Sequence, residues 1–442
     1  MKKIILTLLI LLSVYGISFG QASWTFVSTV PGSPNINSIS VVDANLIWAA
    51  CDGGSVFKST NAGVNWTSVS TGLPATNLYG ISALDASNCW VGTGAGAIYR
   101  TTDGGTSWAS QVSISGSFIN GVKMFDANYG IFTGDPTGNG QPYQNRYTTN
   151  GGANWILAPN SPIGTNEFGV INAWDWLDTN TIWIGSANTV ANATTAKIFK
   201  TSTGYSGTWS FATVLGTGGS AGLYYQAIAF TDANNGMSGS NGNNFVKTTD
   251  GGVTWTSVSN PAGVTTFAAI NMYGFKDGSN RIRVSINETT GYRMFTTTNY
   301  GTTWTEETLP SQGTTNGVQH MQFVNNVLGY SGGNAGTFLR CDVPSGILSN
   351  NGSVPEDYIL TQNYPNPFNP VTKIEYALPQ NSFVTLKVYD VTGKEVSELV
   401  DGLRSAGNYE INFDASNLNS GVYFYTLITE GFTETKKMLL IK

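Results

Sequence analysis

Charged residues, histidine and cysteine are all scarce in this chain of 442 residues. Lys, Arg, Asp and Glu together make up 11% of it, the net charge is −6, and the only histidine is His320. Because no Lys/Arg cluster runs through the body of the chain, the composition argues against nucleic-acid binding. One histidine with three dispersed cysteines argues against a zinc site, and no Asp-rich loop has the spacing of a calcium loop. We therefore expect no metal and no cofactor.

The cysteines are too few and too scattered for a disulfide framework. Cys51, Cys89 and Cys341 make an odd number, and we expect each to be a small buried hydrophobic side chain.

Long apolar runs are also rare. After residue 20 none is long enough to span a bilayer, so no transmembrane segment is expected.

The clearest apolar run lies at the N-terminus. Lysines at positions 2 and 3 precede the apolar stretch Ile4–Leu12, and Ser18-Phe19-Gly20 supplies the small residues of a cleavage site. This order is typical of a secretory signal peptide, which we assign to residues 1–20 with cleavage before Gln21.

Glycine, serine, threonine and asparagine are abundant, and one short pattern of these residues recurs. Thr101–Trp108 reads TTDGGTSW, and its copies follow the pattern S/T-x-D/N-x-G-x-x-W, with one stretched copy that ends at Trp209. The residues at the third position are Asn61, Asp103, Asn150, Asp250 and Asn299, and the closing tryptophans are Trp66, Trp108, Trp155, Trp209, Trp255 and Trp304. The gaps between these tryptophans are 42, 47, 54, 46 and 49 residues, which is the period of a propeller blade.

The sequence around each box predicts a four-stranded blade. Each unit has an innermost strand that ends in a turn acid, a second strand, a third strand, the boxed turn and a fourth strand. The seventh unit stops after Cys341 without a fourth strand. Ser23–Ser28 resembles Asn65–Ser70, the fourth strand of the first unit, so we expect the N-terminal strand to complete the last blade. These features predict one seven-bladed β-propeller over residues 21–346.

The box itself needs no catalytic role. Asp or Asn at its third position can bond backbone N–H groups of its own loop, glycine permits a positive φ, and tryptophan covers the hairpin. The pattern resembles the Asp-box, or BNR, repeat of sialidases, sortilin-type receptors, xyloglucanase-type glycosidases and the photosystem II assembly-factor propeller. The resemblance implies the fold and boxes that lie away from the active centre, but no particular chemistry.

The acids and arginines of the ring do not favour a sialidase. A sialidase resemblance would imply an arginine triad, yet most propeller arginines occupy equivalent places just before the boxed turn: Arg100, Arg146, Arg293 and Arg340. Glycoside hydrolysis needs two facing carboxylates. Most acids recur in the turn and box columns, and the exception is Asp175, with Asp135 and Glu167 in nearby loops. We assign no catalytic residue and expect His320 to be packed or to line the channel.

When the seven units are aligned on the turn acid, one further set of equivalent positions, here called a column, is not required by the fold. It lies six positions before the turn acid and reads Asn37, Tyr79, Asn120, Asn172, Gln226, Asn271 and Gln319. Because the innermost strand lines the channel, these residues should ring the channel mouth on the face opposite the boxes. Carboxamides donate and accept hydrogen bonds without charge. They could cap their own loops and bind water, or they could bind a glycan or protein together with Trp174 and Asp175.

The composition changes after Ser345. Residues 347–357 predict a linker, and the short strands of residues 358–442 predict a small Ig-like β-sandwich. Asn363–Pro370, Val388–Lys394, Gly421–Tyr425 and Lys436–Lys442 resemble the type A C-terminal sorting domain of the type IX secretion system. The resemblance implies recognition by the secretion machinery through residues 358–442, passage across the outer membrane, and release or attachment to surface lipopolysaccharide.

The sequence thus predicts an all-β chain, a seven-bladed β-propeller followed by a small Ig-like β-sandwich. We expect an exported protein, secreted or attached to the outer-membrane surface, that binds a glycan or protein at the channel mouth. The alternative is a secreted glycoside hydrolase that acts at the same face.

Overall fold

The computed structural model describes residues 23–342, 357–379, 382–404, 407–429 and 431–442. The described residues form two compact units, one that ends at Asp342 and one in the C-terminal part of the chain. The expected signal peptide, residues 1–20, and the expected linker up to residue 356 lie outside the described residues. No helix in the described part of the chain is long and apolar enough to cross a membrane.

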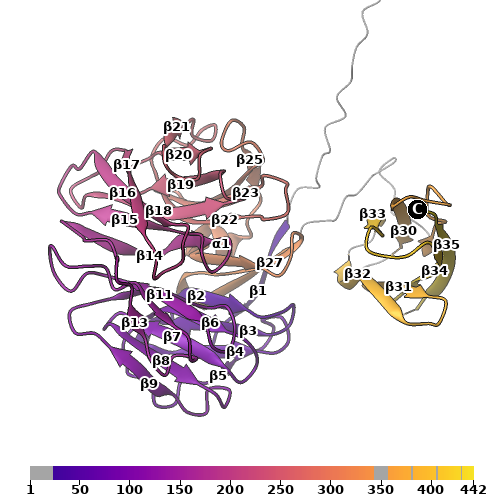
Figure 1. Cartoon of the computed structure of the whole chain (residues 1–442), viewed down its shortest axis with the longest axis horizontal. Helices are drawn as coiled ribbons and strands as arrows, with labels where there is room; N and C mark the ends of the chain where they lie inside the picture. Colours follow the sequence, from indigo (N-terminus) through magenta and orange to yellow (C-terminus); the bar gives the residue numbers. More distant parts are fainter. Residues whose placement is uncertain (1–22, 343–356, 380–381, 405–406, 430) are drawn as a thin grey trace, which may run out of the picture. The chain divides into compact units, whose positions relative to one another are not determined.

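The first unit is a ring of seven antiparallel blades (Figure 1). Blades 1 and 2 contain β2 (Ile36–Val41), β3 (Ile47–Cys51), β4 (Val56–Ser59), β5 (Thr67–Ser68), and β6 (Leu78–Ala83), β7 (Cys89–Thr93), β8 (Ala97–Thr101), β9 (Ala109–Ser113). Blades 3 and 4 contain β10 (Ile119–Met124), β11 (Gly130–Gly134), β12 (Arg146–Thr148), β13 (Ile156–Leu157), and β14 (Glu167–Trp176), β15 (Ile182–Asn188), β16 (Thr195–Thr201), β17 (Trp209–Leu215). Blades 5 and 6 contain β18 (Leu223–Phe230), β19 (Gly236–Ser240), β20 (Phe245–Thr248), β21 (Thr256–Val258), and β22 (Phe267–Gly274), β23 (Ile282–Glu288), β24 (Gly291–Thr297), β25 (Thr305–Glu307).

The seventh blade is closed by the N-terminal strand, as predicted. It contains β26 (His320–Phe323), β27 (Leu328–Gly332), β28 (Thr337–Asp342) and β1 (Ser23–Thr29). β1 runs antiparallel to β28 with Trp24 opposite Cys341. A short helix, α1 (Ser311–Asn316), connects blade 6 to this blade. Because both ends of the propeller share one sheet, the closing blade has its full four strands.

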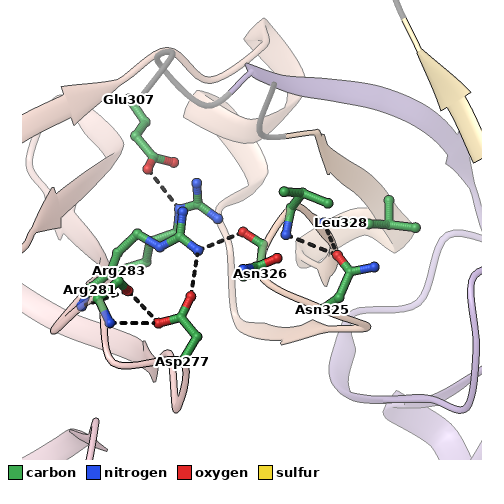
Figure 2. A network of polar contacts seen from close by, with 9 residues as sticks. Asp277, Arg281, Arg283, Glu307, Asn325, Asn326 and Leu328 are labelled. Atoms are coloured by element: carbon green, nitrogen blue, oxygen red, sulfur yellow. Dashed lines mark hydrogen bonds and ion pairs between the residues drawn. The ribbon is translucent and has the colours of Figure 1, made fainter. Parts of the chain in front are cut away.

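A buried ion pair also anchors β1 to blade 6. The carboxylate of Glu307 accepts hydrogen bonds from Nε of Arg283 and from Nε1 of Trp24, each at 2.7 Å. Figure 2 shows Arg283 and Glu307 beside Arg281, whose guanidinium donates to the carbonyl of Asn326 at 2.6 Å. Trp24 lies on β1 and Glu307 on β25. The N-terminal strand is therefore bonded to two blades rather than one.

The boxed turns of blades 1, 2, 3, 5 and 6 share the same hydrogen bonds. In Thr101–Trp108 the Asp103 carboxylate accepts from the backbone N–H of Ser107 at 3.0 Å, and Oγ1 of Thr101 donates to it at 2.8 Å. The buried Thr101 hydroxyl also accepts from the N–H of Gly105 at 2.9 Å. Hydrogen bonds, above all those from Ser107, lower the pKa of Asp103 to about 2. The first threonine is thus as central to the turn as the acid.

Thr101→Val is expected to lower the free energy of unfolding by about 1–3 kcal/mol, because the buried N–H of Gly105 loses its acceptor. Asp103→Ala should lower stability as well, since its carboxylate closes the same loop. Chemical denaturation followed by tryptophan fluorescence measures both. Thr106→Val is the control: its exposed hydroxyl donates only to the carbonyl of Asp103, so a change within about 0.5 kcal/mol is expected. Wild-type stability of Thr101→Val would contradict this role.

The boxed turns also accept hydrogen bonds from side chains of the preceding blade. The carbonyl of Gly151 in the third box accepts from Nε1 of Trp90 at 3.2 Å and from Arg100 at 2.9 Å, both on blade 2. The carbonyl of Gly251 in the fifth box accepts from Nε1 of Trp183 on blade 4 at 2.9 Å. Tryptophans at the start of the second strand are therefore fully buried, whereas several box tryptophans keep partial exposure. Arg100 therefore has a structural role, as its position just before the boxed turn predicted.

The C-terminal unit is a sandwich of two sheets. One sheet has the order β29 (Ile359–Leu360), β30 (Val371–Leu378), β33 (Gly407–Asp414), and the other β32 (Glu395–Arg404), β31 (Ser382–Asp390), β34 (Gly421–Ile428), β35 (Thr433–Leu440). Ile374, Leu386, Tyr425 and Met438 are fully buried between the sheets. β34 and β35 pair from Gly421 to Thr433, which confirms the predicted closing hairpin. The all-β fold, a propeller followed by a small sandwich, is confirmed.

Candidate functional site at the channel mouth

The amide column coincides with a repeated β-bulge. In blades 1, 2, 3 and 5 the pairing between the first two strands skips one residue, and the skipped residues are Asn37, Tyr79, Asn120 and Gln226. A bulged residue leaves the ladder and its side chain is re-aimed. The column is therefore a structural feature of the innermost strand, placed at the end of the blade opposite the boxes.

Several of these side chains bond the neighbouring blade. Nδ2 of Asn37 donates to the carbonyl of Leu78 on blade 2 at 3.0 Å, and Nε2 of Gln226 donates to the carbonyl of Ala269 on blade 6. The amide oxygen of Asn271 accepts from the backbone N–H of Met321 on blade 7 at 3.1 Å. These contacts hold adjacent blades together and use one end of each carboxamide.

Other column members bond within the mouth face. Nδ2 of Asn120 donates to Oδ1 of Asp135 at 2.7 Å, and Nε2 of Gln319 donates to the hydroxyl of Tyr292 at 3.2 Å. Tyr79 packs against Phe118 with ring centroids 4.6 Å apart. Asn120 and Asn271 are buried, at 2% and 4% exposure. The members that keep partial exposure are Asn37, Tyr79, Asn172, Gln226 and Gln319.

Asn172 reaches across the mouth. The ladder between β14 and β15 breaks between Gly169 and Trp174, and Asn172 has a φ of 56° in the break. Its Nδ2 donates to the backbone carbonyl of Asn37 on blade 1 at 2.9 Å. Asparagine is one of the few residues that tolerate this left-handed conformation. One side chain of blade 4 thus spans to the other side of the ring and narrows the channel.

Trp174 lines the channel, and the carboxylate of Asp175 is bonded to neighbouring blades. Trp174 is 9% exposed and packs against Trp176 with ring centroids 5.0 Å apart. Oδ2 of Asp175 accepts from the backbone N–H of Phe230 at 2.7 Å and pairs with Lys276 at 2.8 Å. These bonds join blade 4 to blades 5 and 6, so they account for Asp175 without a ligand.

The two other acids singled out in the sequence do lie at the mouth face. Burial raises the pKa of Asp135 to about 6, against the opposing effect of hydrogen bonds from Asn120 and the N–H of Gly169. Glu167 is buried and pairs with Lys197 at 2.7 Å. Burial raises the pKa of Tyr143, and the charges of Glu167 and Asp135 raise it further.

One further column was missed in the sequence. It lies three positions before the turn acid and accepts backbone N–H groups from the next blade. Oγ of Ser40 accepts from Ala83, Oγ of Ser82 from Met124, each at 2.9 Å, and Oε1 of Gln322 from Val41 at 2.9 Å. His320 lines the channel, as expected, and its Nδ1 accepts from the N–H of Ile39 at 3.1 Å. The alignment on the turn acid that exposed the amides could have exposed this column as well.

A groove lies on the mouth face beside blade 6. Its volume is ≈ 540 Å³, and it is lined by Gly263, Thr265, Thr266, Glu288, Thr289, Thr290 and Arg293. Glu288 pairs with Phe267 in the ladder, so the groove lies at the end of the sheet where the innermost strand begins. Arg293 pairs with Glu288 at 3.1 Å and with Glu306 at 2.7 Å, so its positive charge is opposed by two carboxylates.

Comparison with known proteins agrees with both units. Residues 362–442 match the family model described as the secretion system C-terminal sorting domain, and residues 19–132 match that of the photosynthesis system II assembly factor YCF48. No curated protein sequence matches the chain significantly.

Solved propellers have the same fold at low identity. The structure titled YCF48 bound to D1 peptide is 14% identical with a TM-score of 0.51, over 72% of this chain and 96% of that one. YCF48 from Cyanidioschyzon merolae is 16% identical with a TM-score of 0.51, over 72% and 98%. The GH74 xyloglucanase from Xanthomonas campestris is 11% identical with a TM-score of 0.52, over 80% and 59%. The chain is thus a β-propeller with Asp-box turns, similar over residues 19–132 to the YCF48 family model, and its C-terminal match to the secretion system sorting domain indicates export, with the protein secreted or attached to the outer-membrane surface.

Proposed function

We propose that the propeller is a binding protein, displayed on the cell surface or released, that holds a glycan or protein at the channel-mouth face. The groove of ≈ 540 Å³ beside blade 6 carries this proposal. The partly exposed carboxamides of the column lie at the same end of the blades. The boxed face holds the repeated turns, whose own hydrogen bonds account for them without a ligand.

The groove lining favours a glycan over an apolar peptide. Four threonines supply hydroxyl groups: Thr265, Thr266, Thr289 and Thr290. The charges of Glu288 and Arg293 compensate each other, so the groove is polar without a strong field of one sign. Hydroxyls and neutral amides pair with sugar hydroxyls as donors and acceptors. A neutral polysaccharide is therefore the ligand class that fits first.

A glycan array and a peptide library, probed with residues 21–346, test this proposal. We expect a saturable glycan ligand whose affinity falls about tenfold or more in Thr265→Ala combined with Thr290→Ala, two threonines of the groove, since each lost hydrogen bond costs roughly 1 kcal/mol. Thr60→Ala, an exposed threonine on the boxed face, is the control and should bind as the wild type. Binding to peptides alone would replace the glycan with a protein ligand, and unchanged affinity in the double variant would remove the groove from the site.

A second candidate is a glycoside hydrolase at the same face. The observation that favours it is Asp135, a carboxyl group whose pKa of about 6 suits a general acid and whose Oδ1 accepts from the N–H of Gly169, two residues after Glu167. If a glycan that binds is also cleaved, Asp135→Asn should abolish cleavage and keep binding. A bound glycan that stays intact with the wild-type protein leaves binding as the function.

A further inference from the structure

The central channel encloses a small polar cavity below the mouth. Its volume is ≈ 20 Å³, and the innermost strands of blades 1, 2, 3, 4 and 7 line it. The polar groups in its wall include Ser40, Ser82, Lys123, His320 and Gln322, and Trp174 and Trp176 supply aromatic faces. A cavity of this size holds one water molecule or one ion of similar size.

Three side-chain oxygen atoms of this wall already accept hydrogen bonds that hold adjacent blades together. The hydroxyl oxygens of Ser40 and Ser82 and the amide oxygen of Gln322 each accept a backbone N–H of the next blade. Nothing in the described chain accepts the protons of these two hydroxyl groups. Each hydroxyl therefore keeps its proton to donate, and Gln322 keeps its NH₂ group.

His320 likewise accepts a backbone N–H and keeps a proton to donate. Its Nδ1 accepts from the N–H of Ile39, so in the neutral ring the proton is on Nε2. Burial lowers the pKa of His320 to about 4, which keeps the ring neutral at physiological pH. This ring adds a further donor to the wall, next to the hydroxyl groups of Ser40 and Ser82 and the NH₂ group of Gln322.

Lys123 adds a positive charge to the same wall. It occupies the column position at which Ser40, Ser82 and Gln322 accept, but an ammonium group can only donate. Among the described residues it has no ion pair and no hydrogen bond, and its Nζ lies 5.5 Å from the ring centre of Trp176. Burial lowers its pKa, and no carboxylate opposes that effect. Asp175, the acid on the neighbouring innermost strand, is paired with Lys276.

We propose that this cavity binds a single small monovalent anion of the chloride or bromide class. The anion would compensate the charge of Lys123 and accept hydrogen bonds from hydroxyl, amide and imidazole donors that belong to several blades. A cation is disfavoured by the ammonium group, and polyatomic anions exceed the space. The site is separate from the groove on the mouth face, and it does not depend on which ligand binds there.

Thermal unfolding of the propeller in sodium chloride and in sodium gluconate, at constant ionic strength, tests the proposal. A bound ion stabilises the folded state by mass action. Above the dissociation constant each tenfold rise in chloride should raise Tm by about 2 °C, while gluconate, which is too large to enter, should not. Lys123→Met should remove this response. Lys58→Met is the matched control, because Lys58 also lies over a tryptophan ring, at 4.8 Å from that of Trp48, but donates to the carbonyls of Ala86 and Gly104 outside the cavity.

A crystal grown in sodium bromide gives a second measurement that needs no variant. We expect an anomalous bromide peak within about 3.5 Å of Nζ of Lys123, in contact with the serine hydroxyls. A water molecule at this position, or a chloride response that persists in Lys123→Met, would overturn the proposal.

Discussion

Glu307→Ala is expected to lower the free energy of unfolding by about 3–5 kcal/mol, because it leaves the Arg283 guanidinium buried without its counter-charge. The side chains of Arg283 and Glu307 are 1% and 3% exposed, and their nearest atoms are 2.7 Å apart. The same carboxylate accepts from Trp24 on β1 and from Oγ1 of Thr296 at 2.7 Å. The substitution therefore removes a charge, two further hydrogen bonds and the link between the N-terminal strand and blade 6.

Urea denaturation with tryptophan fluorescence measures this loss, and the preceding residue supplies the control. Glu306 pairs with Arg293, but its side chain is 50% exposed, so Glu306→Ala should cost less than about 1 kcal/mol. Limited proteolysis should also cut Glu307→Ala first near β1, since this strand loses the side-chain hydrogen bond from Trp24 to blade 6. Equal stability of the two variants would show that the ion pair does not anchor the closing strand.

Much of the ring was predictable because a repeat supplies its own alignment. The boxes fixed the blade period, and the similarity of Ser23–Ser28 to Asn65–Ser70 located the strand that completes blade 7. The ion pair behind that closure was not predictable. Arg283 and Glu307 are 24 residues apart and occupy no shared column, so only the packing of three strands brings them together.

The candidate site was predictable in position but not in geometry. The turn acid located the amides at one end of the innermost strands, yet the bulges that expose them depend on strand pairing. The contact between Asn172 and Asn37 could not be predicted. It requires the break in strand pairing between Gly169 and Trp174, and no repeated pattern in the sequence indicates that break. The groove beside blade 6 was missed for a similar reason, since two loops form it and neither repeats in the other blades.

The sequence also drew attention to the box tryptophans, whereas the tryptophans of the second strand are more deeply buried. Trp183 is 0% exposed, stacks on Phe230 with ring centroids 3.6 Å apart, and donates to the carbonyl of Gly251. Trp183→Ala is expected to cost about 3–5 kcal/mol, because it opens a cavity between blades 4 and 5 and leaves that carbonyl without its donor. The effect should match that of Glu307→Ala although no charge is involved.

Trp304→Ala is the matched control for this prediction. Trp304 closes the sixth box, remains partly exposed, and donates to the carbonyl of Ser259 at 2.9 Å. A loss of about 1–2 kcal/mol is expected, since water can fill the space that the indole leaves. Urea denaturation of the two variants should therefore give clearly different midpoints. A larger loss of stability in Trp304→Ala than in Trp183→Ala would contradict the prediction. It would show that the boxed turn stabilises the blade more than the contact between the second strand and the box of the next blade.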